Sequence, residues 1–213
     1  MARRKRGSSG RWLHEHRTDP FVAEAAKEGY RARSVYKLRE IDERDGLVRS
    51  GMRVVDLGAA PGAWSQYLAR RIGPKGSVVA LDILEMDPVV NVTFLQGDFR
   101  DDTTLVRLRD AIGIEPVDLV VSDMAPNMGG IRAADQAQSM YLAELAYELC
   151  GEVLDHGGSF LVKVFQGEGI DAYRATLKSA FEKLKTRKPK ASRDRSREQY
   201  LLAEGFTLGS TLG

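Results

Sequence analysis

The segment from Val54 to Trp64 constrains the fold of this chain more than any other part of the sequence. An apolar run ends in Asp56, a turn of small residues follows, and a helical pattern begins at about Ser65. A strand, a tight loop and a helix in this order are typical of the place where an open α/β sheet binds a nucleotide. Glycine suits such a loop because it lets the backbone approach a ligand closely or adopt a positive φ without strain.

The glycine spacing of this loop favours a nucleoside ligand without phosphates. Dinucleotide-binding folds use the pattern G-x-G-x-x-G and place the pyrophosphate at the N-terminus of a helix. Here Gly58 and Gly62 are separated by two alanines and a proline, so the dinucleotide pattern is absent. We therefore expect the loop, with Trp64 at its end, to bind S-adenosylmethionine. A nicotinamide-dependent dehydrogenase is disfavoured for the same reason.

Strand and helix patterns alternate from Arg53 onward. Strands are expected at residues 53–57, 77–82, 91–95, 117–122, 158–164 and 199–204, with a weaker signal near 184–188. Helices are expected at residues 63–72, 102–112, 134–154 and 170–184. Such alternation favours right-handed crossovers and a mostly parallel sheet with helices on both faces. The sequence thus predicts a Rossmann-like α/β fold with a twisted sheet of about seven strands.

Helical patterns also precede this sheet. Ser34 is expected to cap a helix that carries Lys37 and ends near Gly46. Its apolar stripe is formed by Val35, Leu38 and Ile41. In the long helix expected at residues 134–154, the apolar stripe is formed by Ala137, Tyr141, Leu145, Leu149 and Val153.

Length and composition predict one soluble domain. The chain has 213 residues, of which 43% are hydrophobic and 29% charged. Residues 1–10 read as a disordered basic arm, and residues 11–213 as one catalytic domain. Within this domain, residues 11–50 form a helical cap and residues 51–206 the Rossmann-like core.

Several classes of protein are disfavoured by the same sequence. No apolar run reaches the roughly 18 residues of a membrane span. The single cysteine, Cys150, excludes an internal disulfide and fits a reducing cytoplasm, where we expect the protein to lie. No metal site is expected, because the histidines lack ligand spacing: His14, His16 and His156.

Acidic residues mark the carboxyl ends of four expected strands. Asp56 and Asp82 end the first two strands, Asp98 follows the third, and Asp123 ends the fourth. One such acid alone would be read as a turn or capping residue. Because the ends of parallel strands meet at one edge of a sheet, we expect all four carboxylates at the ligand site. Asp82 is placed to accept hydrogen bonds from ribose hydroxyls, and Asp98 to meet the adenine amino group.

Lys163 interrupts a strand that otherwise reads as fully buried. A parallel strand covered on both faces is normally a continuous run of Val, Ile and Leu. A charge inside it needs a carboxylate partner, or it must extend past the edge of the sheet to water. We expect Lys163 to lie at the active centre beside Asp123.

These motifs closely resemble those of the FtsJ/RrmJ family of ribosomal RNA large-subunit 2′-O-ribose methyltransferases. The resemblance runs from about residue 11 to residue 204. The matching segments are Arg11–Leu13, Tyr36–Leu38, Val54–Gln66, Leu95–Asp101, Ser122–Met128, Val162–Gly169, Arg187–Pro189 and Arg195–Glu198. One departure is Ala63, where the family pattern has a glycine, and this adds only a methyl group.

The resemblance implies a class I methyltransferase fold, S-adenosylmethionine as methyl donor and a catalytic set of four residues. The set is Lys37, Asp123, Lys163 and Glu198, with Lys163 as proton acceptor. Burial and a nearby Lys37 favour the neutral amine of Lys163, whereas the two carboxylates favour its ammonium form. Lys163 therefore remains either a general base or a cation that stabilises developing negative charge.

The resemblance also implies a substrate. It implies the 2′-hydroxyl of one ribose, in a uridine of 23S ribosomal RNA, on an assembled or nearly assembled large ribosomal subunit. Small relatives suggest that the protein is a monomer. Two alternatives stay open: methylation of transfer RNA or an RNA cap, and an RNA-binding assembly factor without activity.

Two basic ends flank an acidic middle, although the net charge is only +2. Residues 1–40 carry 11 basic and 5 acidic residues, and residues 178–197 carry 9 and 2. This asymmetry suggests a polyanion bound by both ends, with ordinary solvated surface charge as the alternative. We expect Arg3–Arg6 and Lys185–Arg197 to contact the RNA backbone and to make binding steeply salt-dependent.

Overall fold

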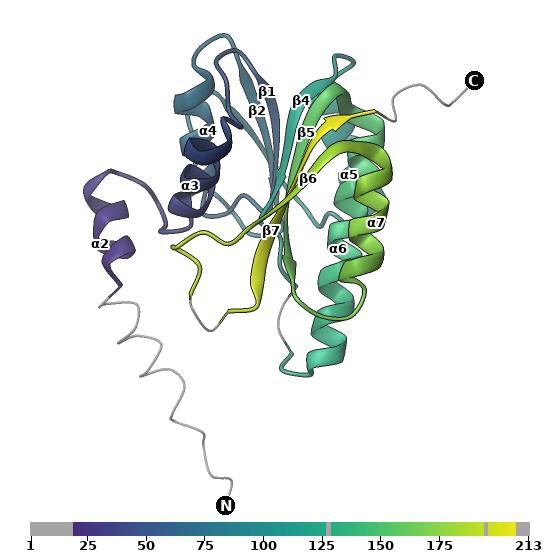
Figure 1. The fold of residues 1–213 in the computed structure, drawn as a ribbon. Helices are drawn as coiled ribbons and strands as arrows, with labels where there is room; N and C mark the ends of the chain where they lie inside the picture. Colours follow the sequence, from purple (N-terminus) through teal and green to yellow (C-terminus); the bar gives the residue numbers. More distant parts are fainter. Residues whose placement is uncertain (1–18, 127–128, 194–195, 208–213) are drawn as a thin grey trace, which may run out of the picture.

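A seven-stranded sheet with helices on both faces forms the centre of the molecule (Figure 1). The computed structural model describes residues 19–126, 129–193 and 196–207. The predicted basic arm and the segment Arg11–Leu13 lie outside these ranges. Among the described helices, none combines the length and apolar character that a membrane crossing requires.

The elements agree closely with the expected ranges. The strands are β1 (Arg53–Leu57), β2 (Ser77–Asp82), β3 (Val92–Gln96), β4 (Val117–Ser122), β5 (Leu154–Phe165), β6 (Phe181–Arg187) and β7 (Glu198–Phe206). The helices are α2 (Pro20–Lys27), α3 (Val35–Asp45), α4 (Ala63–Ile72), α5 (Asp102–Ile112), α6 (Arg132–Val153) and α7 (Ile170–Ala180).

The strand order is β3-β2-β1-β4-β5-β7-β6. The first five strands in this order pair in parallel, and β7 runs antiparallel between β5 and β6. The mostly parallel sheet predicted from the alternation of elements is therefore confirmed. The carboxyl ends of the parallel strands meet at one edge, as a ligand site of this fold requires.

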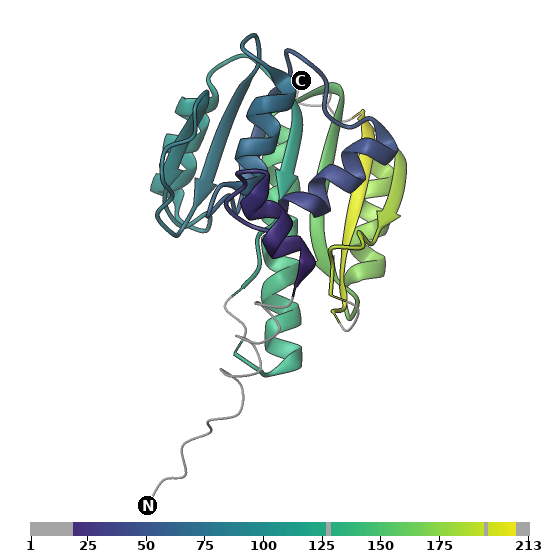
Figure 2. The ribbon, with the colours of Figure 1, turned by 90° about the vertical axis from the view of Figure 1, so that its left-hand side faces the viewer.

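Side chains that alternate along each strand build two separate cores. Val55 of β1 belongs to the core under α5, α6 and α7, whereas its neighbour Val54 belongs to the core under α3 and α4. Figure 1 shows the two groups of helices on opposite sides of the sheet, and Figure 2 looks onto the side of α2 and α3. The expected stripe of α3 is confirmed, because Val35, Leu38 and Ile41 are all buried.

The predicted stripe of α6 is right at Leu145, Leu149 and Val153, which pack in the core, and wrong at Ala137 and Tyr141, which are exposed. A spacing of four residues overshoots one helical turn by about 40°, so a stripe of this spacing winds around a long helix. The predicted cap of α3 is also wrong, since Ser34 has a helical backbone conformation and its side chain makes no capping hydrogen bond.

Three element boundaries differ from the prediction by three residues or more. Helix α7 ends at Ala180 rather than at residue 184, because β6 begins at once with Phe181. Strand β6 therefore starts three residues before the weak signal near 184–188. Strand β5 begins at Leu154, directly after α6, and not at residue 158.

Candidate active site

The pairing of three strands brings the central residues of the site together. Ser122 at the end of β4 pairs with Val162, and in the next pair of strands Lys163 lies opposite Tyr200. Asp123, which directly follows β4, is therefore adjacent to Lys163. The neighbours of Lys163 on its own face of the sheet pack under α3 and α4, so Lys163 faces the same side as these helices.

Asp123 and Lys163 form a largely buried ion pair. The Nζ of Lys163 lies 3.0 Å from Oδ1 of Asp123 and also donates to the Asp123 backbone carbonyl. Their side chains are 17% and 8% exposed. The hydroxyl of Tyr200 donates to the same Oδ1 at 2.8 Å. Burial, helped by the charges of Asp123 and Glu198, raises the pKa of Tyr200 well above its usual value, so its hydroxyl remains a donor.

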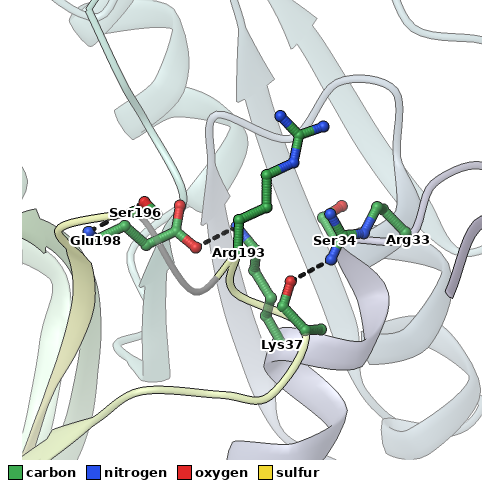
Figure 3. A pocket seen from close by; sticks show the side chains of 7 residues that line it. Arg33, Ser34, Lys37, Arg193, Ser196 and Glu198 are labelled. Atoms are coloured by element: carbon green, nitrogen blue, oxygen red, sulfur yellow. Dashed lines mark hydrogen bonds and ion pairs between the residues drawn. The ribbon is translucent and has the colours of Figure 1, made fainter. Parts of the chain in front are cut away.

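Lys37 and Glu198 form a second ion pair. The Nζ of Lys37, on α3, lies 2.6 Å from Oε1 of Glu198 at the start of β7. A dashed line marks this contact in Figure 3. Oε1 of Glu198 also accepts a hydrogen bond from Ser192 at 2.8 Å. The Nζ of Lys37 lies 5.9 Å from the ring centroid of Tyr200. Tyr200 therefore touches both ion pairs, and sequence reasoning missed it because a tyrosine in a buried strand reads as ordinary core.

A cavity of about 340 Å³ opens beside the second ion pair (Figure 3). It is lined by Arg33, Ser34, Lys37, Ala191, Arg193, Ser196 and Glu198. The lining contains three cationic side chains and one carboxylate. A cavity with such a balance favours an anionic ligand, because the low-dielectric walls strengthen the positive potential inside it.

The glycines of the loop after β1 allow close contact with other backbone and side-chain atoms. A Cβ at Gly58 would lie 2.8 Å from the backbone nitrogen of Met124, which follows Asp123. A Cβ at Gly62 would lie 2.7 Å from Nη1 of Arg31. Both glycines also have positive φ, +78° and +103°. The loop is thus pressed against the end of β4 on one side and against the α2–α3 connection on the other.

Asp82 holds this loop, whereas Asp98 binds a neighbouring arginine. Asp82 accepts hydrogen bonds from the backbone N–H of Ala60 at 2.9 Å and of Leu84 at 2.8 Å. Asp98 binds Arg100, with 2.6 Å between Oδ2 and Nη2. This contact lowers the pKa of Asp98, so its carboxylate is ionised.

Asp56 is completely buried at the end of β1. Its Oδ2 accepts a hydrogen bond of 2.6 Å from the hydroxyl of Ser65, and its Oδ1 has no partner among the described residues. Burial raises the pKa of Asp56 to about 7, against the opposing effect of Ser65. The negative charges of Asp123 and Asp82 act in the same direction as burial.

Trp64 lies in the core between α3 and α4. It is 3% exposed, its indole N–H donates to the backbone carbonyl of Ser34 at 2.8 Å, and its ring packs on Tyr200 at 5.8 Å. In this arrangement the indole N–H is used within the protein. Trp64 therefore supports the site from the core, as a packing partner of Tyr200.

The topology, the glycine loop and the acids at the strand ends together define a Rossmann-like class I methyltransferase. Residues 30–206 match the model of the FtsJ-like methyltransferases. The chain belongs to this family, which confirms the resemblance noted in its motifs.

Individual relatives support this assignment. A protein of Pseudomonas paraeruginosa named ribosomal RNA large subunit methyltransferase E is 59% identical over 206 residues, covering 97% of this chain and 99% of the relative. A protein of the same name from Pseudomonas fluorescens is 57% identical, covering 97% and 98%.

Solved structures agree with the fold. The crystal structure of a ribosomal RNA methyltransferase from Plasmodium falciparum superposes with a TM-score of 0.75 at 28% identity, covering 83% of this chain and 98% of that one. A fibrillarin/Nop5p complex, at 19% identity and a TM-score of 0.52 over 75% of each chain, shares the fold alone.

Proposed function

We propose that this protein transfers a methyl group from S-adenosylmethionine to a ribose 2′-hydroxyl of large-subunit ribosomal RNA. The names of relatives at 59% and 57% identity support this substrate class. The observation that carries the chemistry is the buried Asp123–Lys163 pair at the carboxyl edge of the sheet. We further infer that the acceptor is one uridine of 23S ribosomal RNA, methylated by a cytoplasmic monomer on the assembled or nearly assembled subunit.

The residues at the carboxyl ends of β1 to β4 fit S-adenosylmethionine. Ile83 and Leu84 follow Asp82 and are 56% and 64% exposed, so they offer an apolar surface that an adenine ring would cover. The carboxylates of Asp82 and Asp98 suit the ribose hydroxyls and the adenine amino group. Gly58 and Gly62 have no side chains, so the backbone of the glycine loop can pack closely against its neighbours beside this surface. When bound, the cofactor supplies an electrophilic methyl group.

The Asp123–Lys163 pair supplies the acid–base chemistry of the protein. A ribose hydroxyl loses its proton as its oxygen gains a methyl group, and Nζ of Lys163 takes up this proton once the ammonium has released one proton to water, because only the neutral amine has a free lone pair. Asp123 keeps Nζ in place, and Tyr200 keeps Asp123 in place through a hydrogen bond of 2.8 Å. In the alternative role, Lys163 stays an ammonium throughout and stabilises the negative charge that develops on the same oxygen, and the proton of the hydroxyl leaves to water.

The second ion pair and the cavity beside it hold the RNA. Lys37 and Glu198 lie next to Tyr200, on the side of the cavity lined by Arg33 and Arg193. Guanidinium groups bind phosphate through paired N–H donors, so Arg193 suits the RNA backbone next to the reacting ribose, whereas Arg33 is paired with Asp19 at 2.8 Å. Lys37 and Glu198 then orient the ribose toward Lys163.

Mapping of 2′-O-methylation in RNA from cells with and without this gene tests the function. We expect one site in large-subunit ribosomal RNA to lose its methyl group and to regain it with the wild-type gene. The gene for Lys163→Met, which keeps a side chain of similar length without the amine, should not restore the site. Purified Lys163→Met should still bind S-adenosylmethionine.

Other outcomes would assign a different role. Loss of methylation in transfer RNA alone would identify transfer RNA as the substrate. Unchanged methylation together with a defect in subunit assembly would favour an assembly factor. Near-normal turnover by Lys163→Met would remove Lys163 from the chemistry.

A further inference from the structure

Arg31 joins two segments that lie far from it in the sequence. Its Nη1 donates to the backbone carbonyls of Pro61, at 3.1 Å, and of Asp87, at 2.6 Å. Its Nη2 donates to the carbonyl of Pro88 at 2.8 Å. Pro61 belongs to the glycine loop after β1, and Asp87 and Pro88 belong to the segment between β2 and β3. A single guanidinium thus binds both loops at the carboxyl edge of the sheet.

The backbone of Arg31 is fixed to helix α4. Its N–H donates to Oε1 of Gln66 at 2.9 Å, and Nε2 of Gln66 donates back to the carbonyl of Gly29 at 3.3 Å. Gln66 lies in the first turn of α4, directly after the glycine loop. The guanidinium therefore extends from a connection that is itself held against the helix of the glycine loop.

The glycine loop is held from two opposite sides. Arg31 binds the carbonyl of Pro61, and Asp82 accepts the N–H of Ala60, the neighbouring residue, at 2.9 Å. Beside this point Gly62 lies so close to Arg31 and to the sulfur of Met86 that a Cβ would come within 2.7 and 2.8 Å of them. Displacing the guanidinium would free one side of the loop and leave three carbonyls without their donor.

We propose that Arg31 is a positioning residue for the methyl donor. By binding Pro61 together with Asp87 and Pro88, it holds the glycine loop and the β2–β3 segment at the separation that S-adenosylmethionine requires. The planar fork of arginine is needed because donors with fixed directions must reach carbonyls of two segments at once, which a lysine ammonium does less well. This inference rests on the proposed use of S-adenosylmethionine.

Calorimetric titration with S-adenosylmethionine tests the proposal. Arg31→Ala should weaken binding by at least about tenfold, because the two loops lose their preorganised spacing. Arg31→Lys should fold with the charge retained and still bind at least about threefold more weakly than wild type. The matched control is Arg70→Ala: Arg70 lines the same surface cavity as Arg31, but its guanidinium lies over the ring of Tyr30 at 4.5 Å. It should leave cofactor affinity unchanged.

A second measurement separates positioning from general destabilisation. Hydrogen exchange of Arg31→Lys without cofactor should become faster in residues 58–62 and 83–91, and remain unchanged in α3 and β7. RNA affinity should stay at the wild-type level, because the donors of Arg31 are directed at carbonyls and not at the RNA cavity.

The outcomes are distinguishable. If wild type binds S-adenosylmethionine and both Arg31 variants bind it equally well, the positioning role is overturned while the proposed function stands. If exchange of both loops is unchanged, the proposed restraint is likewise overturned. If wild type itself binds no S-adenosylmethionine, the proposed function falls, and the positioning role falls with it.

Discussion

Tyr200 connects the two ion pairs of the site through two different parts of its side chain. Its hydroxyl binds Asp123, and its ring lies beneath the ammonium of Lys37. Tyr200→Phe removes only the first contact. We expect its kcat to fall by about tenfold, which corresponds to the loss of one hydrogen bond of roughly 1.4 kcal/mol. Methylation of large subunits isolated from cells lacking the gene measures this rate.

Two further results test whether the Tyr200 hydroxyl supports Asp123. Cofactor affinity should not change in Tyr200→Phe, because the ring still packs on Trp64. A kcat within twofold of wild type would show that Asp123 needs no support from the hydroxyl.

Asp56 is expected to make the stability of the cofactor-free protein depend on pH. Its folded pKa of about 7 lies above the unfolded value near ~4. Between these values the folded state binds more protons than the unfolded state, so stability falls as pH rises through this window. Asp56→Asn removes the effect, and at pH 8 it should be more stable than wild type by up to about 4 kcal/mol.

Urea unfolding at pH 5 and pH 8 measures this difference. The matched variant is Ser65→Ala, which removes the hydroxyl that favours the ionised carboxylate. Its stability should decline more steeply with pH than that of wild type. Parallel pH curves for wild type and Asp56→Asn would contradict a titrating Asp56.

The sequence predicts the role of a residue whose charge conflicts with the apolar segment around it. It does not predict the role of a residue whose partners lie far away along the chain. Lys163 was conspicuous because a charge interrupts an apolar strand, and the structure places it beside Asp123 as expected. Arg31 gave no such signal, since its partners are backbone carbonyls up to 57 residues away. Trp64 follows the glycine loop and reads as a ligand contact, yet its position is set by the packing of α3 on α4.

Helix α3 is attached to the far edge of the sheet by one buried carboxylate. Asp45, its last residue, binds Arg187 at the end of β6 with distances of 2.6 and 2.7 Å, and its side chain is 4% exposed. The hydrogen bonds from Arg187, followed by those of Lys185, lower the pKa of Asp45. Asp45→Asn should therefore cost about 2–4 kcal/mol of stability at pH 7.

The pH dependence of this loss has the opposite sign to that of Asp56. Because the folded pKa of Asp45 is lowered, its contribution is complete above the unfolded value near ~4 and disappears as pH falls below it. Urea unfolding at pH 7 and pH 3 should show the deficit of Asp45→Asn shrinking at the lower pH. As control, Glu152→Gln breaks the exposed pair with Arg109 and should change stability by less than about 1 kcal/mol.

The bounds of a helix or strand are predicted accurately where the sequence carries a clear signal for its end. Helices α4 and α5 were predicted to the residue, because glycines follow their last turns at Gly73 and Gly113. Strand β6 was predicted poorly because its sequence, FEKLKTR, alternates charges rather than apolar residues. An edge strand avoids aggregation in this way, and the same charges hide it from pattern analysis.

At the scale of the whole molecule, the described basic residues of the segment Lys185–Arg197, the basic C-terminal cluster, form two groups with different surroundings. Lys185 and Arg187 were expected to contact RNA, but they are paired with Asp45, and Lys185 also with Glu204 at 2.6 Å. Lys190 and Arg193 are exposed, and Arg193 lines the cationic cavity. We therefore expect the RNA contacts of this cluster in the segment between β6 and β7.

The double variant Lys190→Ala with Arg193→Ala tests this division. It should weaken RNA binding and lower the slope of log K against log salt by about 1 to 2, one for each lost phosphate contact. Titration of RNA at several salt concentrations measures the slope. Lys75→Ala is the control, because Lys75 precedes β2 and so lies where the parallel strands begin, opposite the carboxyl edge that carries the site. An unchanged slope in the double variant would place the RNA elsewhere.

The position of β7 also determines when the site is completed during synthesis. β7 is the last of the seven described strands to be translated, yet it lies between β5 and β6 and carries Tyr200 and Glu198. A nascent chain that has not yet released β7 from the ribosomal exit tunnel leaves Lys163 without Tyr200 and Lys37 without its carboxylate. The second ion pair and the hydroxyl that supports Asp123 therefore form only after β7 has inserted between β5 and β6, so the active site is completed late in folding.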